Sequence, residues 1–413
     1  MRTDVARVAL LLLAVVTFSC SSRPAFDVIV RGGTVYDGSG SPGRVADVGV
    51  TGDRIAAIGD LASARGGETV DATGRAVAPG FIDVDSRAGL SLIADGDADS
   101  YVRQGITTAI LVRDSAVYVP PPASQAAVLT AFHFSPDWNG IAAYYTRLVA
   151  HGTAINVGTL VPARGRAADA VGAEIRNGAL GTMVEGFLQS DVAAAQHAAA
   201  VGRMLAATNR IYATDVPVTA SPRDVLDATV AMASGAGLKH ALVVLNDSSL
   251  PPEEVERVVQ ALRPLAQGGV AISIALDPLN ADAFRLFEWS GTLVGSGAPA
   301  VRAGNALEAI GSRASFGSFP QLLGAARNGR ISLQTAVYQA TALPAARFGL
   351  RGRGELRQGY YADLVVFDPA RIQPAAAGAA SPYPTGIDYV MVNGVLTVRP
   401  AGHTGSRPGR FLR

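Results

Sequence analysis

Cysteine and lysine are almost absent from this sequence of 413 residues, in which Cys20 and Lys239 are the only ones. A single cysteine excludes a disulfide within the chain. The net charge is +1, so the overall charge does not favour nucleic-acid binding. The preference for arginine over lysine indicates the codon bias of a GC-rich bacterial genome. The length suits one large domain with a small companion domain.

The first 20 residues have the pattern of a bacterial lipoprotein signal peptide. Two arginines precede an apolar run, Val8 to Phe18, which is short for a membrane span and suits the hydrophobic region of a signal. Cys20 follows, where a lipoprotein carries its lipid. The two residues at 17 and 18 depart from the favoured small and aliphatic pair, so an ordinary secretory signal is the alternative. We expect cleavage before Cys20 and a lipid anchor on the periplasmic face of a membrane in the cell envelope.

Both ends of the chain are rich in β-strand signals. We expect one hairpin around Arg31-Gly-Gly33 and a second around Thr51-Gly-Asp53. Near the C-terminus, residues 362–367 form a predicted strand, and Asn393-Gly394 is a strong signal for another hairpin. We expect the two ends, residues 26–79 and 346–413, to form one small β-sandwich domain together.

The middle of the chain alternates strand-like runs with alanine-rich helical stretches. Eight strands are predicted, over 81–84, 107–112, 154–160, 179–184, 210–214, 241–245, 270–276 and 292–296. Strands that alternate with helices indicate parallel βα units. Eight such units predict an α/β fold with a (β/α)8 TIM-like barrel over residues 80–345. A doubly wound sheet is the alternative.

Several segments resemble the amidohydrolase superfamily. Pro79 to Val84 is similar to the superfamily signature in which barrel strand 1 ends in a His-x-His pair. Longer segments most resemble the D-aminoacylase family, the N-acyl-D-amino-acid deacylases. These are residues 26–38, 102–108, 151–157, 178–181, 343–350, 359–369 and 407–410. The resemblance runs from about residue 26 to the end. It implies metal-assisted amide hydrolysis, with zinc bound at the carboxyl ends of the barrel strands.

The positions that align with the family's metal ligands carry other residues. Asp85 and Arg87 replace the His-x-His pair, Asp114 replaces the cysteine, Ala163, Asp215 and Leu245 replace histidines, and Gly297 replaces the strand 8 aspartate. None of the five histidines, His133, His151, His197, His240 and His403, aligns with a ligand. Zinc needs imidazole, thiolate or carboxylate ligands, and a cation at Arg87 repels a metal. We therefore expect that this chain binds no zinc and has no catalytic set of residues. Such a chain is a pseudoenzyme.

Three arrangements could replace the metal. In the first, Arg87 forms a buried ion pair with Asp114 or Asp215. In the second, carboxylates at the strand ends bind Mg²⁺ or Ca²⁺ through oxygen; the candidates are Asp85, Asp114, Glu185, Asp215, Asp247 and Asp277. In the third, these acids are solvated. The charge of Arg87 favours the first arrangement.

The sequence thus predicts an envelope lipoprotein that is anchored to a membrane. It binds a small ligand or a protein at the barrel mouth without catalysis. The alternative function is an active hydrolase of amide bonds in N-acyl-amino-acid-like substrates, working without a metal or with an unusual site.

Overall fold

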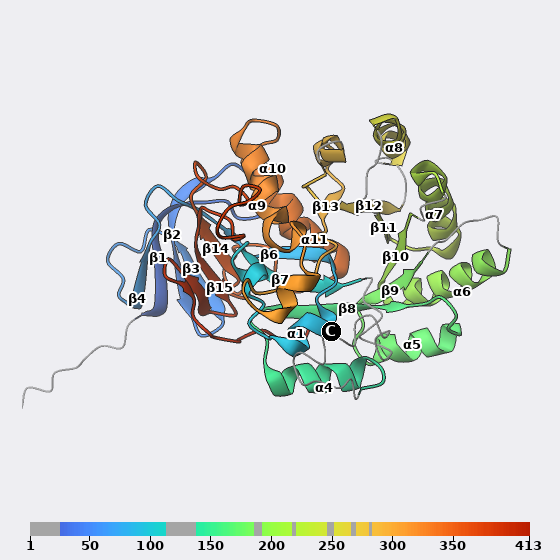
Figure 1. Ribbon diagram of the computed structural model, residues 1–413, viewed down its shortest axis with the longest axis horizontal. Coiled ribbons are helices and arrows are strands. Elements are labelled where there is room, and N and C mark those ends of the chain that lie inside the picture. Colours follow the sequence, from blue (N-terminus) through green and yellow to red (C-terminus); the bar gives the residue numbers. More distant parts are fainter. Residues whose placement is uncertain are drawn as a thin grey trace, which may run out of the picture.

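The computed structural model describes residues 25–112, 138–185, 192–216, 220–245, 252–265, 270–280 and 283–413. The predicted signal peptide with Cys20, and also Asp114, His133 and Asp247, lie outside the described residues. The chain folds into a β-sheet domain and a barrel that lie side by side (Figure 1). Over the described ranges, no helix has the length and apolar character that crossing a membrane would need.

Eight parallel strands form the barrel in chain order. They are β6 (Phe81–Ser86), β7 (Ile106–Leu111), β8 (Asn156–Pro162), β9 (Gly181–Val184), β10 (Ile211–Asp215), β11 (His240–Val244), β12 (Ala271–Leu276) and β13 (Thr292–Val294). Two backbone hydrogen bonds close the ring: Gly297 donates to Asp85 O at 2.8 Å, and Arg87 donates to Ala298 O at 2.9 Å. The eight predicted strands and the barrel are confirmed. The doubly wound alternative is wrong, because the strand order does not reverse at a switch point.

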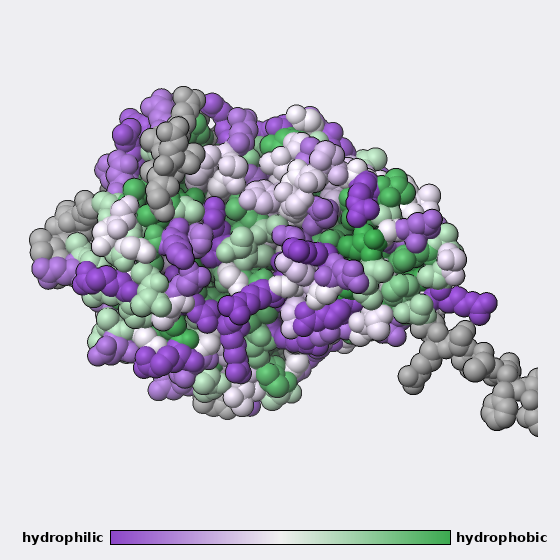
Figure 2. Space-filling view, turned by 180° about the vertical axis from the view of Figure 1, so that it is seen from behind, coloured by the Kyte–Doolittle hydropathy of each residue, from purple (hydrophilic) through white to green (hydrophobic). Residues whose placement is uncertain are grey.

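Helices cover the outside of the barrel (Figure 1). They are α1 (Gly89–Ala94), α2 (Asp99–Val102), α4 (Ile141–His151), α5 (Ala168–Arg176), α6 (Val192–Thr208), α7 (Pro222–Ala236), α8 (Pro252–Leu265), η2 (Ala283–Glu288), η3 (Ala306–Ile310), α9 (Ala314–Arg327), α10 (Leu333–Ala340) and α11 (Ala342–Phe348). The surface is mixed: on the face opposite to that of Figure 1, hydrophilic residues lie between smaller hydrophobic patches (Figure 2). Such a surface is ordinary for a globular protein.

The inside of the barrel is a packed apolar core. Inward-facing side chains such as Val84, Ile110 and Leu242 pack together, and Phe348 of α11 and Leu412 of the C-terminal tail join the same cluster. α11 and the tail therefore cover the base of the barrel, where the strands begin. A filled interior places any chemistry at the other end, the mouth, where the strands end.

Both chain ends build the β-sheet domain, as predicted. The N-terminal strands are β1 (Phe26–Val35), β2 (Arg44–Thr51), β3 (Arg54–Gly59), β4 (Gly66–Asp71) and β5 (Ala76–Pro79). The C-terminal strands are β14 (Leu364–Phe367), β15 (Ile387–Val392), β16 (Val395–Arg399) and β17 (Gly402–His403). They form a nine-stranded sheet, in which the antiparallel pairing of β5 with β14 joins the two ends.

One predicted hairpin is wrong. Arg31-Gly-Gly33 lies inside β1, which pairs with β2 on both sides of a register shift between Val30 and Gly33. The glycines serve a β-bulge: Gly32 has a φ of +69°, and a Cβ at Gly33 would lie 2.4 Å from the Val77 side chain. The other two hairpins are confirmed. β2 and β3 flank Thr51-Gly-Asp53, and Asn393-Gly394 joins β15 to β16 with both φ angles positive.

Candidate functional site at the barrel mouth

A buried polar network joins the first and last strands of the barrel. The carboxylate of Asp83 in β6 accepts hydrogen bonds from the backbone N–H groups of Ser296, at 3.0 Å, and Asp85, at 3.1 Å. The Ser296 hydroxyl donates to the same carboxylate at 2.5 Å. Burial raises the pKa of Asp83 to about 6, although the hydrogen bonds from Ser296 act in the opposite direction. This carboxyl group therefore holds the closing seam of the barrel.

Tyr101 of α2 supports the seam from outside the barrel. Its hydroxyl donates to the Ala298 carbonyl at 2.7 Å and lies 3.0 Å from the Ser86 hydroxyl and 3.1 Å from that of Ser296. Burial, together with the nearby Asp83, raises the pKa of Tyr101, so the phenol stays a hydrogen-bond donor. The network holds the two chain segments that carry the aligned ligand positions 85, 87 and 297.

Asp85 and Arg87 lie at the mouth, but they differ in exposure. A register shift interrupts β6 between Asp83 and Ser86. Ser86 faces Tyr101 on the helix side. Asp85 and Arg87 lie at the carboxyl end of β6, which belongs to the mouth of the barrel. Asp85 is buried whereas Arg87 is exposed. The expectation of a buried guanidinium is therefore wrong.

The predicted ion pairs of Arg87 have a mixed outcome. In the described part of the chain, no ion pair joins Arg87 to Asp85 or Asp215. The pairing with Asp215 is not formed, because the Arg87 side chain extends to solvent. The pairing with Asp114 involves a residue outside the described ranges and stays a prediction.

The other aligned positions also meet at the mouth. Ala163 follows β8, Asp215 ends β10, Leu245 follows β11 and Gly297 follows β13. Ala163 and Leu245 are buried, Asp215 is half-buried, and Gly297 has a φ of +61°. The fold thus brings together the positions that the alignment selected. Among the described ones, only Asp85 and Asp215 keep a side chain that can bind a metal.

None of the described imidazoles occupies an aligned ligand position. His197 of α6 has its Nε2 atom 3.2 Å from the backbone carbonyl of Ala163, so its ring contacts the backbone at one of these positions. His240 begins β11 and lies 3.4 Å from a guanidinium nitrogen of Arg347. His403 of β17 contacts the carbonyl of Asp97, which lies between α1 and α2, at 3.0 Å, and His151 ends α4. None of these four replaces a lost zinc ligand at the mouth.

The donor set does not fit the family's zinc site. Within the described ranges, no group of three or more His, Cys, Asp or Glu side chains is placed to hold a metal ion. Asp277, after β12, is buried, and its carboxylate accepts from the Leu279 N–H at 3.1 Å. A catalytic zinc needs three protein ligands in one tight shell. Among the described aligned positions, the two carboxylates of Asp85 and Asp215, without an imidazole or a thiolate, do not supply that shell; Asp114 lies outside the described residues.

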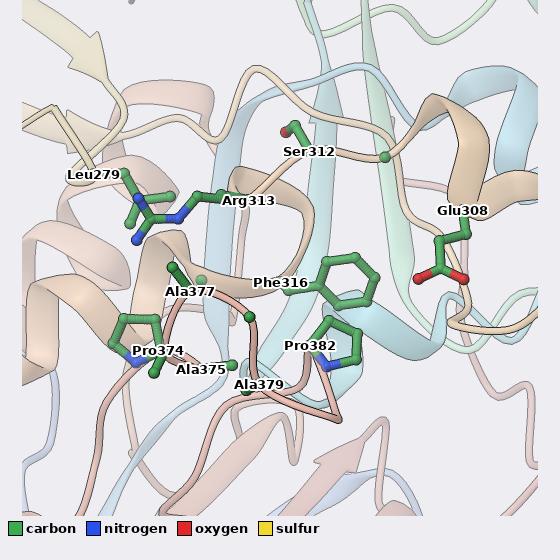
Figure 3. Close-up of a pocket in the computed structure, with 14 residues that line it drawn as sticks. Leu279, Glu308, Ser312, Arg313, Phe316, Pro374, Ala375, Ala377, Ala379 and Pro382 are labelled. Atoms are coloured by element: carbon green, nitrogen blue, oxygen red, sulfur yellow. The ribbon is translucent and has the colours of Figure 1, made fainter.

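A cavity of about 470 Å³ opens beside the start of α9. It lies between the segment after η3 and the alanine-rich loop 374–382 of the β-sheet domain, and Leu279, after β12, belongs to its wall. Phe316 and Pro382 point toward one another, Arg313 extends toward Leu279, and Glu308 lies on the other side (Figure 3). The wall is mostly apolar, with one charge of each sign, which suits a small amphipathic ligand.

Sequence comparison decides the family. A D-aminoacylase from Alcaligenes xylosoxydans xylosoxydans is 31% identical over 495 aligned positions, which cover 95% of this chain and 99% of that protein. The chain belongs to the D-aminoacylase family of amidohydrolases. An N-acyl-D-glutamate deacylase from the same organism is 30% identical, with 94% of this chain and 96% of that protein covered. Residues 308–398 match the pattern described as Amidohydrolase family.

Solved structures share this fold. A D-aminoacylase crystal structure has a TM-score of 0.78 and 24% identity, covering 94% of this chain and 100% of that chain. The N-acyl-D-glutamate deacylase of Bordetella bronchiseptica has a TM-score of 0.76 and 24% identity, covering 94% of this chain and 99% of that chain. That enzyme was solved with zinc and a phosphonate inhibitor, a mimic of the reaction's tetrahedral intermediate. The predicted recognition and fold class are confirmed.

The polar network at the seam was not among the predicted site residues. Asp83 lies within the signature segment Pro79 to Val84, and its place two residues before the first ligand position is a usable signal. Ser296 directly precedes the aligned position Gly297, which is a similar signal. Tyr101 carries no such signal, since it meets Asp83 and Ser296 only after the barrel closes.

Proposed function

We propose that this D-aminoacylase family member is a cell-envelope lipoprotein that binds a small ligand at the barrel mouth and has lost the zinc-dependent hydrolysis of its family. One observation carries the proposal: of the described positions that align with metal ligands, only Asp85 and Asp215 keep a ligand side chain. Zinc lowers the pKa of a bound water and polarises the carbonyl group of the substrate. Without it, the mouth lacks the family's nucleophile.

The cavity beside α9 supports binding of a small molecule next to the mouth: its wall includes Leu279, which follows β12, although it includes none of the aligned ligand positions. Its apolar wall, formed by Phe316, Pro374 and Pro382, offers contact area, while Arg313 and Glu308 offer charges for polar ends of the ligand. An N-acyl amino acid has this character, with an apolar acyl chain and a carboxylate. The relatives' names, D-aminoacylase and N-acyl-D-glutamate deacylase, favour the same class of ligand.

Metal analysis of the purified protein is the first test. We expect clearly substoichiometric zinc, and no turnover of N-acyl-D-amino acids above background, with or without added zinc. The N-acyl-D-glutamate deacylase of Bordetella bronchiseptica, which was solved with zinc, serves as a positive control for metal loading. Stoichiometric zinc together with turnover that a chelator abolishes would contradict the proposal.

A metal-independent amide hydrolase is the second candidate. The carboxylates of Asp85 and Asp277 at the strand ends favour it, because a carboxylate can act as a general base toward water. Turnover of N-acyl-D-amino acids that survives a chelator and is lost in Asp85→Asn would support this candidate against the first.

The proposed lipid anchor is tested separately. The order of two arginines, an apolar run and Cys20 supports it. We expect Cys20→Ser, expressed in a bacterial host, to shift most of the protein from the membrane fraction to the soluble fraction, because the substituted side chain cannot accept a lipid. Fractionation with an antibody measures this. An unchanged distribution, with signal cleavage at another site, would indicate an ordinary secretory signal.

A further inference from the structure

A second cavity, of about 550 Å³, lies at the base of the barrel, opposite the mouth. Three chain segments form most of its wall: residues 208–210 before β10, residues 348–353 at and after the end of α11, and the C-terminal tail at 410–413. Five of the lining residues are arginines, namely Arg210, Arg351, Arg353, Arg410 and Arg413, and the lining contains neither aspartate nor glutamate. The wall is therefore strongly basic in a protein whose net charge is only +1.

The C-terminal tail, which carries two of these arginines, is held in place by backbone hydrogen bonds and packing. In the tail, Arg410 O accepts from Val157 N at 2.8 Å, and Leu412 N donates to Val157 O at 2.9 Å. Leu412 enters the core of the barrel, and the ring of Phe411 lies 4.1 Å from that of Tyr145. A site on rigid elements keeps its charges converging on one space.

The charge balance separates the arginines into two groups. Arg353 pairs with Asp363, and Arg410 pairs with Asp53 at 2.5 Å, so carboxylates behind the wall neutralise these two. The other group is Arg210, Arg351 and Arg413, which have no ion pair within the described residues. Three guanidinium groups without an ion-pair partner among the described residues thus line one cavity, where an anion would interact favourably with all of them.

We propose that this basal cavity binds a multivalent oxyanion, a phosphate group above all. Guanidinium groups present planar pairs of donors that match the oxygens of a phosphate and bind it in a bidentate manner. The ring of Tyr361 lies 4.0 Å from the Arg353 guanidinium and completes the wall. The phosphate comes either from a free phosphate or pyrophosphate ion or from the headgroup of an anionic lipid. The site is separate from the mouth and independent of the function proposed above.

Calorimetric titration of the full-length protein tests the site, with inorganic phosphate and pyrophosphate as probes. Vesicles of phosphatidylglycerol, compared with vesicles of phosphatidylcholine, test the lipid source. The test variant combines Arg210→Gln, Arg351→Gln and Arg413→Gln. The control variant combines Arg44→Gln, Arg203→Gln and Arg371→Gln, which removes the same charge from exposed positions. Thermal unfolding of all three proteins without ligand shows that each is folded.

We expect the test variant to bind at least about tenfold more weakly, because each charge-assisted hydrogen bond to an anion contributes substantially to affinity. The control variant should bind like the wild type. Binding of phosphate or pyrophosphate that depends on the three arginines supports the site with a free ligand. If the three arginines matter only for binding to phosphatidylglycerol vesicles, the site binds a lipid headgroup. The proposal would be overturned if neither phosphate ions nor vesicles bind, or if chloride at the same ionic strength gives the same titration signal. It would also be overturned if the test and control variants lose the same affinity.

Discussion

Replacing Arg353 by methionine is expected to lower the free energy of unfolding by about 3–5 kcal/mol. Arg353 and Asp363 are 6% and 5% exposed and form an ion pair. Methionine fills much of the same volume but leaves the Asp363 carboxylate buried without its cation. Removing one partner of such a pair is far more costly than removing both.

Hydrogen bonds around Asp363 keep its carboxylate in the buried position. Its carboxylate also accepts from the Asn393 N–H at 2.8 Å and lies 3.3 Å from the amide nitrogen of Asn156 in β8. The pair therefore sits where the C-terminal part of the β-sheet domain meets the barrel, and the carboxylate cannot turn to solvent without opening that contact. Loss of the cation should destabilise both domains together.

Urea denaturation, followed by fluorescence, measures this effect. Arg357→Met serves as the matched control, because Arg357 is exposed, and a surface substitution of this kind usually changes stability by less than about 0.5 kcal/mol. The double variant Arg353→Met, Asp363→Asn should recover part of the lost free energy of unfolding, since it removes the buried negative charge that has no cation beside it. Equal midpoints for Arg353→Met and Arg357→Met would contradict a structural role of the pair.

The second large effect concerns pH. We expect Asp83→Asn to gain stability relative to the wild type as the pH rises from 4 to 7, by about 2–3 kcal/mol. The pKa of Asp83 is about 6 in the folded chain, against a usual value of 3.8. Between these values the native state holds a proton that the unfolded state has released. The contribution of Asp83 to stability is therefore present below about pH 4 and is lost as the pH rises through 6.

Asparagine suits this position because it is neutral at every pH. Its side-chain oxygen can accept from the backbone N–H groups of Ser296 and Asp85, and its amide can donate to the Ser296 hydroxyl, which now donates to Asp83. Urea denaturation of both proteins at pH 4, 5, 6 and 7 measures the difference. Asp60→Asn, at an exposed position, controls for the loss of a charge. A constant difference between Asp83→Asn and wild type over this range would show that Asp83 titrates normally.

The amino-acid sequence determined the architecture of this protein. The eight barrel strands, the β-rich ends and the turn at Asn393-Gly394 were all predicted, because each rests on a local pattern of apolar residues and turn residues. The residues that we align with the family's metal ligands, at 85, 87, 114, 163, 215, 245 and 297, could also be read from the sequence, because family-like segments flank most of them; the loss of the metal site stays a prediction. Which side chain stands at an aligned position can be read from the sequence without a structure.

Tertiary structure alone decided how distant residues meet. Gly32 and Gly33 have the composition of a turn, but β2 and β5 pair with the strand around them and make them a bulge. Arg87 was expected to be buried beside Asp215, yet the seam that Asp83 and Ser296 close leaves it in solvent. The five arginines at the base come from three segments that share no sequence pattern. Their convergence depends on the docking of the C-terminal tail under the barrel, and such long-range contacts arise from packing, which no local pattern encodes.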